Sequence, residues 1–227
     1  MYCVREASQG ENIHVHPGRF YLTRAEDSKA KYVAEPRVGF QRSAPQNNFR
    51  RLIAAMIEPG NFCLDTVSFV PESESQPPLA FVLALLNSEL ADWYFSLGST
   101  NSKVNEYQFR NLPCPRFRPD ETPAETAAGV AAVDLLAAAR PDLAVAVLEP
   151  LLADAPFPPA VRAAVVAAVD GIVTAEAARG VISRTDRSAL SAAAQPYQDF
   201  LDTVFFRLAG LSDAEVAGLR KRYAAMN

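Results

Sequence analysis

The amino-acid composition changes near residue 119, and this change limits the possible folds more than any other feature of the sequence. Residues 119–227 contain 29 alanines among 109 residues, with apolar residues at helical spacing and few residues that favour strands. Breaks at Pro141, Pro156–Pro159, Gly180 and Gly210 divide this part into about five helices. The second half of the chain is therefore predicted to be an all-α region.

Two capping boxes mark helix starts in this alanine-rich region. Thr122 precedes Pro123 and Glu125, and Ser212 stands three positions before Glu215. Alanine favours the helix but offers little apolar area for burial, so such helices must pack closely against one another or against a partner.

The first half has a different composition, with many aromatic and β-branched residues. The runs that are typical of strands are Asn12–His16, Arg19–Thr23, Lys31–Ala34, Arg37–Arg42 and Phe62–Val70. We therefore predict an α+β fold. A domain with a mixed or antiparallel sheet and a packed long helix covers residues 1–118, and an all-α alanine-rich helical region covers residues 119–227.

The long helix is predicted from the apolar spacing of Leu79–Leu97, where leucines and aromatic residues recur at steps of three and four. A Pro77-Pro78 pair suits its first turn, and Gly98 suits its C-terminal cap. Glu89 and Asp92 lie within this stretch, which favours a buried helix over a membrane span.

Charge is distributed unevenly, although the net charge of the whole chain is −4. Residues 1–118 hold 13 Lys and Arg against 12 Asp and Glu, whereas residues 119–227 hold 9 against 14. The acidic total argues against a nonspecific nucleic-acid coat. Residues 36–57, however, carry no acidic residue and four arginines, which are Arg37, Arg42, Arg50 and Arg51. Local density is what counts, because salt screens charges beyond roughly 8–10 Å.

The usual signatures of an enzyme are missing from the sequence. It contains no glycine-rich phosphate loop, no zinc-protease helix motif, no nucleophile elbow and no kinase signature. His14 and His16 are interpreted as surface residues of a strand rather than metal ligands, because no third ligand is evident. The string Asp27–Lys29 matches the end of a nuclease metal site, but three-residue matches arise by chance.

The cysteines and the first residues of the chain indicate the cellular compartment of the protein. The three cysteines are far apart and form no CxxC pair, so we expect a reducing compartment and packed thiols at Cys63 and Cys114. Arg5, Glu6 and Glu11 stand where a signal peptide would need an apolar core. The sequence thus predicts a cytoplasmic protein with no membrane partner.

Two polar segments combine the side chains that contact nucleic acids. In residues 42–51, arginines can clamp phosphates or read guanine, and amides can pair with adenine edges. Residues 99–107 carry short amides and hydroxyls, which contact phosphates in some proteins and cap helices in others. A solvated loop is the alternative for each segment. The candidate DNA-binding residues are Arg37, Arg42, Gln46, Asn47, Asn48, Arg50, Arg51, Asn101, Ser102, Lys103 and Asn105.

Four strings are more specific in their order than any one of them alone, and they are Pro36–Arg42, Asn48–Phe62, Leu83–Tyr94 and Asn105–Pro115. In this order they resemble the C-terminal target-recognition domain of Taq-like adenine-specific DNA methyltransferases, closest to the version fused into type IIG restriction–modification enzymes. That family shows an arginine-bearing strand, a stretch close to R-T-hydrophobic-A-A-x-I-P-P-G, a helix with L-L-N-S-x-x-x-D-W and a closing L-P-x-P. The resemblance covers about residues 30–118 and touches the tail at Phe200–Ser212.

The resemblance implies that the chain reads the sequence of double-stranded DNA. In the family, a catalytic domain flips the target adenine and transfers a methyl group from S-adenosylmethionine. This chain lacks the family's Asn-Pro-Pro-Tyr or Asp-Pro-Pro-Tyr string, and its nearest match, Gln76–Leu79, has neither the polar acceptor nor the aromatic residue. We therefore expect no enzyme activity and no cofactor here, and a methyltransferase or restriction catalytic domain or subunit as a partner.

The chain also departs from the family pattern in places that bear on target choice. Glu58 stands where proline is common, and Gly39–Gln41 stands where the family often has Arg-Asp. Residues 120–195 match nothing in the pattern, and by analogy they form a helical spacer.

Three hypotheses remain open from the sequence. The first is a sequence-specific DNA-binding module that works with a separate catalytic part. The second is a protein-interaction or assembly subunit whose acidic helical half docks a methyltransferase or nuclease. The third, an enzyme whose site the sequence does not reveal, has no constellation of residues to support it.

Overall fold

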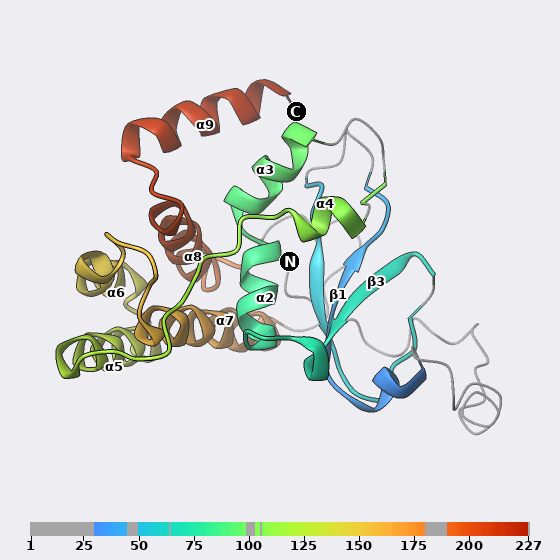
Figure 1. The fold of residues 1–227 in the computed structure, drawn as a ribbon, viewed down its shortest axis with the longest axis horizontal. Helices are drawn as coiled ribbons and strands as arrows, with labels where there is room; N and C mark the ends of the chain where they lie inside the picture. The colour runs from blue at the N-terminus through green and yellow to red at the C-terminus, as the bar shows by residue number, and fades with distance from the viewer. Residues whose placement is uncertain are drawn as a thin grey trace.

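The computed structural model describes residues 30–44, 50–63, 65–98, 103–104, 106–179 and 190–226 (Figure 1). A small sheet stands on one side of the molecule and a group of helices on the other, with helix α2 (Leu79–Leu86) between them. The fold is α+β, as predicted. No helix in the described ranges is long and apolar enough to cross a membrane.

The sheet has three antiparallel strands in the order β2-β1-β3. Strand β1 (Arg37–Gln41) lies in the centre, and β2 (Ala54–Ile57) and β3 (Val67–Pro71) pair with its two edges. Val38 faces Met56 on one side and Val70 on the other. The strand predicted at Arg37–Arg42 is confirmed.

Other strand predictions are corrected. Lys31–Ala34 belongs to the 3₁₀ helix η2 (Ala30–Ala34), in which the consecutive residues Tyr32 and Val33 are both buried. A strand would have turned these two side chains to opposite faces. The strand expected from Phe62 begins only at Val67.

The apolar segment that follows Arg51 was not assigned as a strand from the sequence, and its second part forms β2. The predicted strands Asn12–His16 and Arg19–Thr23 lie outside the described residues.

The predicted helix Leu79–Leu97 is two helices, α2 and α3 (Glu89–Gly98), separated by Asn87 and Ser88. The hydroxyl of Ser88 accepts a hydrogen bond from Ala91 N at 3.1 Å, which is the bond an N-cap residue makes. Asn87 bonds to the backbone of β2 instead of lying along a continuous helix. Polar residues thus interrupt an apolar pattern that by itself suits one helix.

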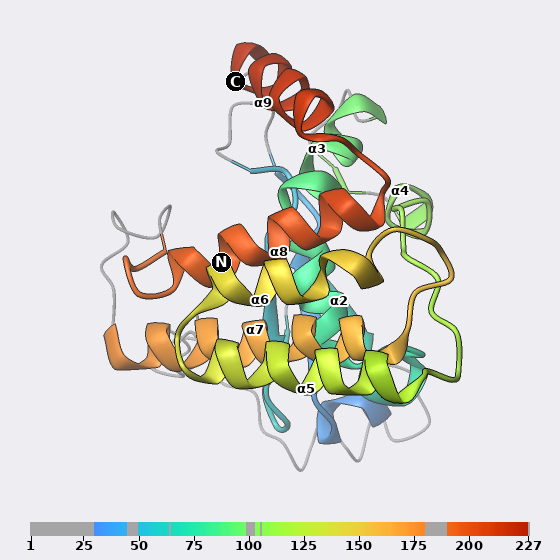
Figure 2. The same cartoon turned by 90° about the vertical axis from the view of Figure 1, so that its left-hand side faces the viewer.

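Within the described residues, the alanine-rich half forms five helices: α5 (Pro123–Ala137), α6 (Pro141–Leu148), α7 (Pro159–Arg179), α8 (Gln195–Leu208) and α9 (Asp213–Met226). Besides η2, the short elements among the described residues are η3 (Glu72–Glu74), α4 (Glu106–Arg110) and η4 (Glu149–Leu151). Figure 2 shows α5, α6, α7 and α8 lying side by side. The predicted division into about five helices is confirmed.

Both predicted capping boxes form. Glu125 N donates to Thr122 Oγ1 at 3.3 Å, while Thr122 N donates to Glu125 Oε2 at 2.7 Å. The same reciprocal pair joins Ser212 and Glu215, with Ser212 N donating to Glu215 Oε2 at 2.8 Å. Each box satisfies two amide groups that a helix start leaves without an intrahelical partner.

One hydrophobic core joins the two halves of the chain. Buried residues form a continuous cluster from Val38 in β1 to Leu219 in α9. Phe81 of α2 packs edge-on against Phe205 of α8, with ring centroids 5.7 Å apart. The predicted division at residues 118 and 119 is therefore not a break between two separate cores.

The alanine-rich helices approach one another closely, and we predict that the close contact between α5 and α7 requires glycine at position 129. A β-carbon at Gly129 would lie 2.6 Å from the β-carbon of Ala160 in α7 and 3.1 Å from its α-carbon, whereas one at Gly218 in α9 would meet no atom within 4 Å. Gly129→Ala should lower the free energy of unfolding by about 1–3 kcal/mol, because backbone and β-carbons cannot move aside.

Gly218→Ala is the matched control, since it makes the same change in an open helical position. It should raise the free energy of unfolding by up to about 1 kcal/mol, because alanine favours the helix. Urea unfolding of both variants tests this pair, and equal effects of the two substitutions would contradict the packing described.

Candidate nucleic-acid interface

The two polar segments predicted from the sequence, residues 42–51 and 99–107, contain residues that pair with each other in the structure. Ser43 and Lys103 form an antiparallel bridge, and Val104 N donates to Arg42 O at 2.9 Å. Residues 45–49 follow Ala44 directly, and residues 99–102 precede Lys103 directly. The bridge therefore joins the attachment points of both segments, although they lie more than fifty positions apart in the chain.

Arg42 and Lys103 are exposed at this bridge. The backbone N–H of Arg42 donates to Thr66 O at 2.9 Å, and its guanidinium Nη1 donates to Asp65 O at 2.8 Å. The bond to Asp65 O directs the guanidinium of Arg42, while the residue stays exposed. Two of the predicted cations are thus exposed at or next to the Ser43–Lys103 bridge, where a phosphate can reach a side chain.

Arg37 and Arg51 are buried, which corrects the prediction that they dock phosphates. Arg37 is 1% exposed, donates from Nη2 to Asn61 O at 2.6 Å and lies over the ring of Phe69. Arg51 is 5% exposed, with its guanidinium 5.6 Å from the ring centre of Phe95. These two arginines support the sheet and α3 from within.

The sequence suggested otherwise because alternation placed Arg37 on the face of β1 opposite Val38. That second face is covered near Arg37 by Tyr32 and Phe69, whose rings meet edge-on at 5.9 Å. A strand pattern indicates which residues share a face, but it does not show whether that face is covered.

Arg50 has an intermediate position. Its Nη2 donates to Ser88 O at 2.9 Å, and its Nε lies 3.9 Å from Asp92 Oδ2. The Arg50 side chain is 21% exposed, whereas that of Asp92 is 2% exposed. Arg50 therefore stands at the edge of the surface, next to the end of segment 45–49.

Asn87 and Asp92 hold the backbone that leads into β2. Asp92 Oδ1 accepts hydrogen bonds from Arg51 N at 2.8 Å and Leu52 N at 2.7 Å. Asn87 bonds to both backbone groups of Ala54, through Oδ1 at 3.1 Å and Nδ2 at 3.0 Å. Asn87 and Asp92 are two of the three fixed polar positions of the L-L-N-S-x-x-x-D string, and in this chain they position a strand.

Asp202 of α8 is also a buried polar residue, and it caps α3. Its Oδ1 accepts a hydrogen bond from Glu89 N at 2.6 Å, and Gln198 donates to its Oδ2 and to the carbonyl of Asn87. Burial raises the pKa of Asp202 to about 6, which the hydrogen bonds from Glu89 N and Gln198 only partly oppose. The helical half thus directly stabilises the helix that carries Asp92.

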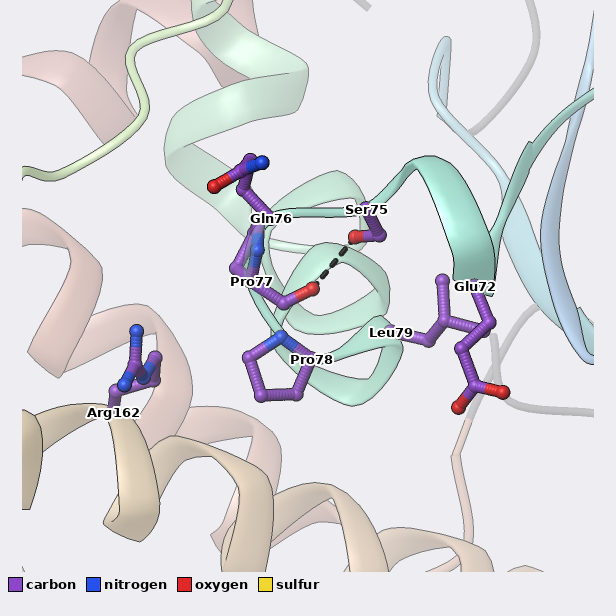
Figure 3. Close-up of a pocket in the computed structure, with 7 residues that line it drawn as sticks. All are labelled: Glu72, Ser75, Gln76, Pro77, Pro78, Leu79 and Arg162. Atoms are coloured by element: carbon purple, nitrogen blue, oxygen red, sulfur yellow. Dashed lines mark hydrogen bonds between the residues drawn. The ribbon is translucent and has the colours of Figure 1, made fainter.

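Two hollows lie near these elements. One of about 320 Å³ is lined by Tyr94, Phe95, Leu97, Gly98, Gln108 and Asn111, at the end of α3 that precedes residues 99–102. The other, of about 370 Å³, lies where Arg162 of α7 faces the loop before α2 (Figure 3). Figure 3 also shows Ser75 Oγ donating to Pro77 O, in the loop that leads into α2; Pro78 is the N-cap of this helix and Leu79 its first residue.

Several predicted residues lie outside the described part of the chain. Among the candidate DNA-binding residues they are Gln46, Asn47, Asn48, Asn101, Ser102 and Asn105. The same holds for His14, His16 and Asp27, which were weighed as metal ligands. The roles predicted for all of them stay predictions.

The described residues offer no group of three or more His, Cys, Asp or Glu side chains that can hold a metal ion. Burial raises the pKa of the thiols of Cys63 and Cys114, and the nearby Arg37 opposes this only in part at Cys63. A raised pKa disfavours the reactive thiolate. Cys63 is partly buried, whereas Cys114 is exposed, so the prediction of a packed thiol is wrong for Cys114.

Comparison with known proteins gives no relative. No family model matches the chain, and no curated protein and no solved structure is significantly similar to it.

Because Asp92 satisfies two buried amide groups, we predict that its removal destabilises the fold. Asp92→Ala should lower the free energy of unfolding by about 2–5 kcal/mol, since Arg51 N and Leu52 N lose their acceptor. Asp92→Asn keeps an accepting oxygen and should lower the free energy of unfolding by less than Asp92→Ala does. Urea unfolding measures both.

Asp134→Ala is the control for this experiment, because Asp134 is an exposed carboxylate on α5 and its loss should change stability by less than about 0.5 kcal/mol. If Asp92→Ala unfolds at the same urea concentration as the wild type, the proposed support of β2 is wrong.

The raised pKa of Asp202 predicts a pH dependence of stability. Between about pH 4 and pH 6, the folded protein keeps a proton on Asp202 that the unfolded chain, with its ordinary pKa of 3.8, has released. The free energy of unfolding should therefore fall as pH rises through this window, by on the order of 1–3 kcal/mol from this group.

Asp202→Asn should remove this part of the pH dependence, while Asp199→Asn, an exposed change on the same helix, should keep it. Urea unfolding across the window gives the comparison. An identical pH profile for the wild type and Asp202→Asn would contradict the raised pKa.

Proposed function

We propose that this chain is a sequence-specific recognition module for double-stranded DNA in a restriction–modification system, working with an adenine methyltransferase or restriction catalytic part that it does not itself contain. The observation that carries the proposal is the Ser43–Lys103 bridge. It joins the attachment points of the two polar segments, with Arg42 and Lys103 exposed beside them.

In this proposal, exposed cations dock the duplex and the amides read it. Arg42 and Lys103 contact phosphates, and Arg50 holds the far end of segment 45–49. The amides of Gln46, Asn47 and Asn48 meet base edges, where a bidentate contact contributes about 1–3 kcal/mol of discrimination. Arg37 and Arg51 take no part in binding and serve as interior supports.

The scaffold under the bridge supports the same assignment. Asn87 and Asp92 fix the backbone at residues 51–54, so residue 50 leaves the core at a defined point. A recognition loop needs such a rigid base, because base contacts depend on its placement. This explains why the helix string and the arginine-bearing segment occur together in one chain.

The chemistry of methyl transfer belongs to a partner in this proposal. In this chain the Gln76–Leu79 string leads into α2, which begins at Leu79. The partner binds S-adenosylmethionine and performs the reaction, and the assembly works in the cytoplasm, where chromosomal DNA lies.

A second function, docking of a protein partner, is favoured by the surface of the helical half. Val130 of α5 is 56% exposed and Leu143 of α6 is 41% exposed, and the exposed Asp134 and Asp142 lie on the same two helices. Copurification of the chain with a methyltransferase or nuclease, without any affinity for DNA, would select this function over DNA recognition.

We predict that the wild-type chain enriches one sequence from a random duplex library and that its affinity falls steeply with salt. Arg42→Gln with Lys103→Gln should weaken binding to every duplex and lower the slope of log affinity against log salt by about 1.8, because each lost phosphate contact removes about 0.9. Fluorescence anisotropy with a random duplex pool measures this slope.

Lys31→Gln with Arg140→Gln is the matched control, since it removes the same charge from exposed positions on η2 and at the start of α6. Its salt slope should equal that of the wild type. A wild-type chain that binds no duplex at low salt would refute the proposed function.

A further inference from the structure

Helix α9 carries a basic segment that the DNA-binding prediction from the sequence left out. Arg220, Lys221 and Arg222 follow one another in this helix, within a half of the chain where acidic residues outnumber basic ones. Lys221 and Arg222 are exposed, and neither forms an ion pair within the described part of the chain.

The opposite face of α9 is fixed against the body of the protein. Val216 and Leu219 are buried in the common core. Arg220 binds the carboxylate of Glu89 through Nε at 3.0 Å and Nη2 at 2.9 Å, and its guanidinium lies over the ring of Phe206. Because successive residues turn by about 100° around a helix, Lys221 and Arg222 point away from this anchored face.

The ion pair between Arg220 and Glu89 places the basic segment of α9 beside the candidate interface. Arg220 binds Glu89, and Arg50 donates to the carbonyl of the preceding residue, Ser88. Figures 1 and 2 both show α9 at the same end of the molecule as α3, away from the sheet end that carries η2. The basic segment of α9 therefore follows directly on a residue that is anchored next to the backbone contact of Arg50.

Helix stability alone does not account for these cations. A basic side chain stabilises a helix electrostatically within its last turn, and the last turn of α9 carries no basic residue. Exposed adjacent cations on a rigid helix suit a polyanion that passes over the surface.

We propose that Lys221 and Arg222 form a second contact with the phosphate backbone of double-stranded DNA, with Arg220 as the residue that positions them. This inference rests on the proposed function and extends it to the helical half. The last helix then holds the duplex against the bridge, so the helical half does more than set a distance.

The test is the salt dependence of binding by the full chain to a duplex pool of random sequence. Lys221→Gln with Arg222→Gln should weaken binding to all sequences alike and lower the salt slope by about 1.8 relative to the wild type. The sequence enriched from a random library should stay the same, because phosphate contacts carry no sequence information. Thermal unfolding of the variant should match that of the wild type, since both side chains are exposed.

Lys31→Gln with Arg140→Gln is again the matched control, because it removes two exposed positive charges at positions outside α9. An unchanged slope in this control, together with a reduced slope in the α9 variant, supports the inference. If the wild type binds DNA and the α9 variant has the wild-type slope, the inference is overturned while the proposed function stands. If the wild type binds no duplex, both are overturned.

Discussion

The backbone between Arg51 and Ala54 depends on buried side chains for its hydrogen bonds, and the sheet of the first half depends on that backbone. Asp92 accepts from two consecutive amides, and Asn87 serves both backbone groups of Ala54. Leaving a buried amide or carbonyl without a partner costs about as much free energy as losing a hydrogen bond. The backbone of residues 51–54 is therefore held in the one position in which these side chains can bond to it. That position fixes where β2 joins β1 and where Arg50 reaches the surface.

The helical half takes part in the same construction. Asp202 and Gln198 of α8 bond to Glu89 N and to the carbonyl of Asn87, at the break between α2 and α3. Phe205 packs on Phe81, and Arg220 of α9 binds Glu89. Alanine and glycine allow α5 and α7 to approach closely, which compensates for the small apolar area of each helix. Tertiary packing thus joins two regions that differ strongly in composition.

One residue type serves different purposes in this fold according to its depth. Arg37 and Arg51 lie inside, over the rings of Phe69 and Phe95, where the planar guanidinium stacks and donates to fixed groups. Arg42 is at the surface, next in sequence to the Ser43–Lys103 bridge. A positive charge is useful to a polyanion only where water and ligand can reach it. The local charge density of residues 36–57 therefore overstates the charge available for binding.

The sequence by itself determined the fold class, the central strand, both capping boxes and the division of the second half into five helices, because short-range periodicity and local hydrogen bonds decide these features. Only the tertiary structure decided that Leu79–Leu97 breaks at Asn87, that two of four arginines are buried and that residues 43 and 103 pair. The position of α9 beside Ser88 and Glu89 was likewise decided only by the tertiary structure. Each of these depends on contacts between residues far apart in the chain, which no local pattern records.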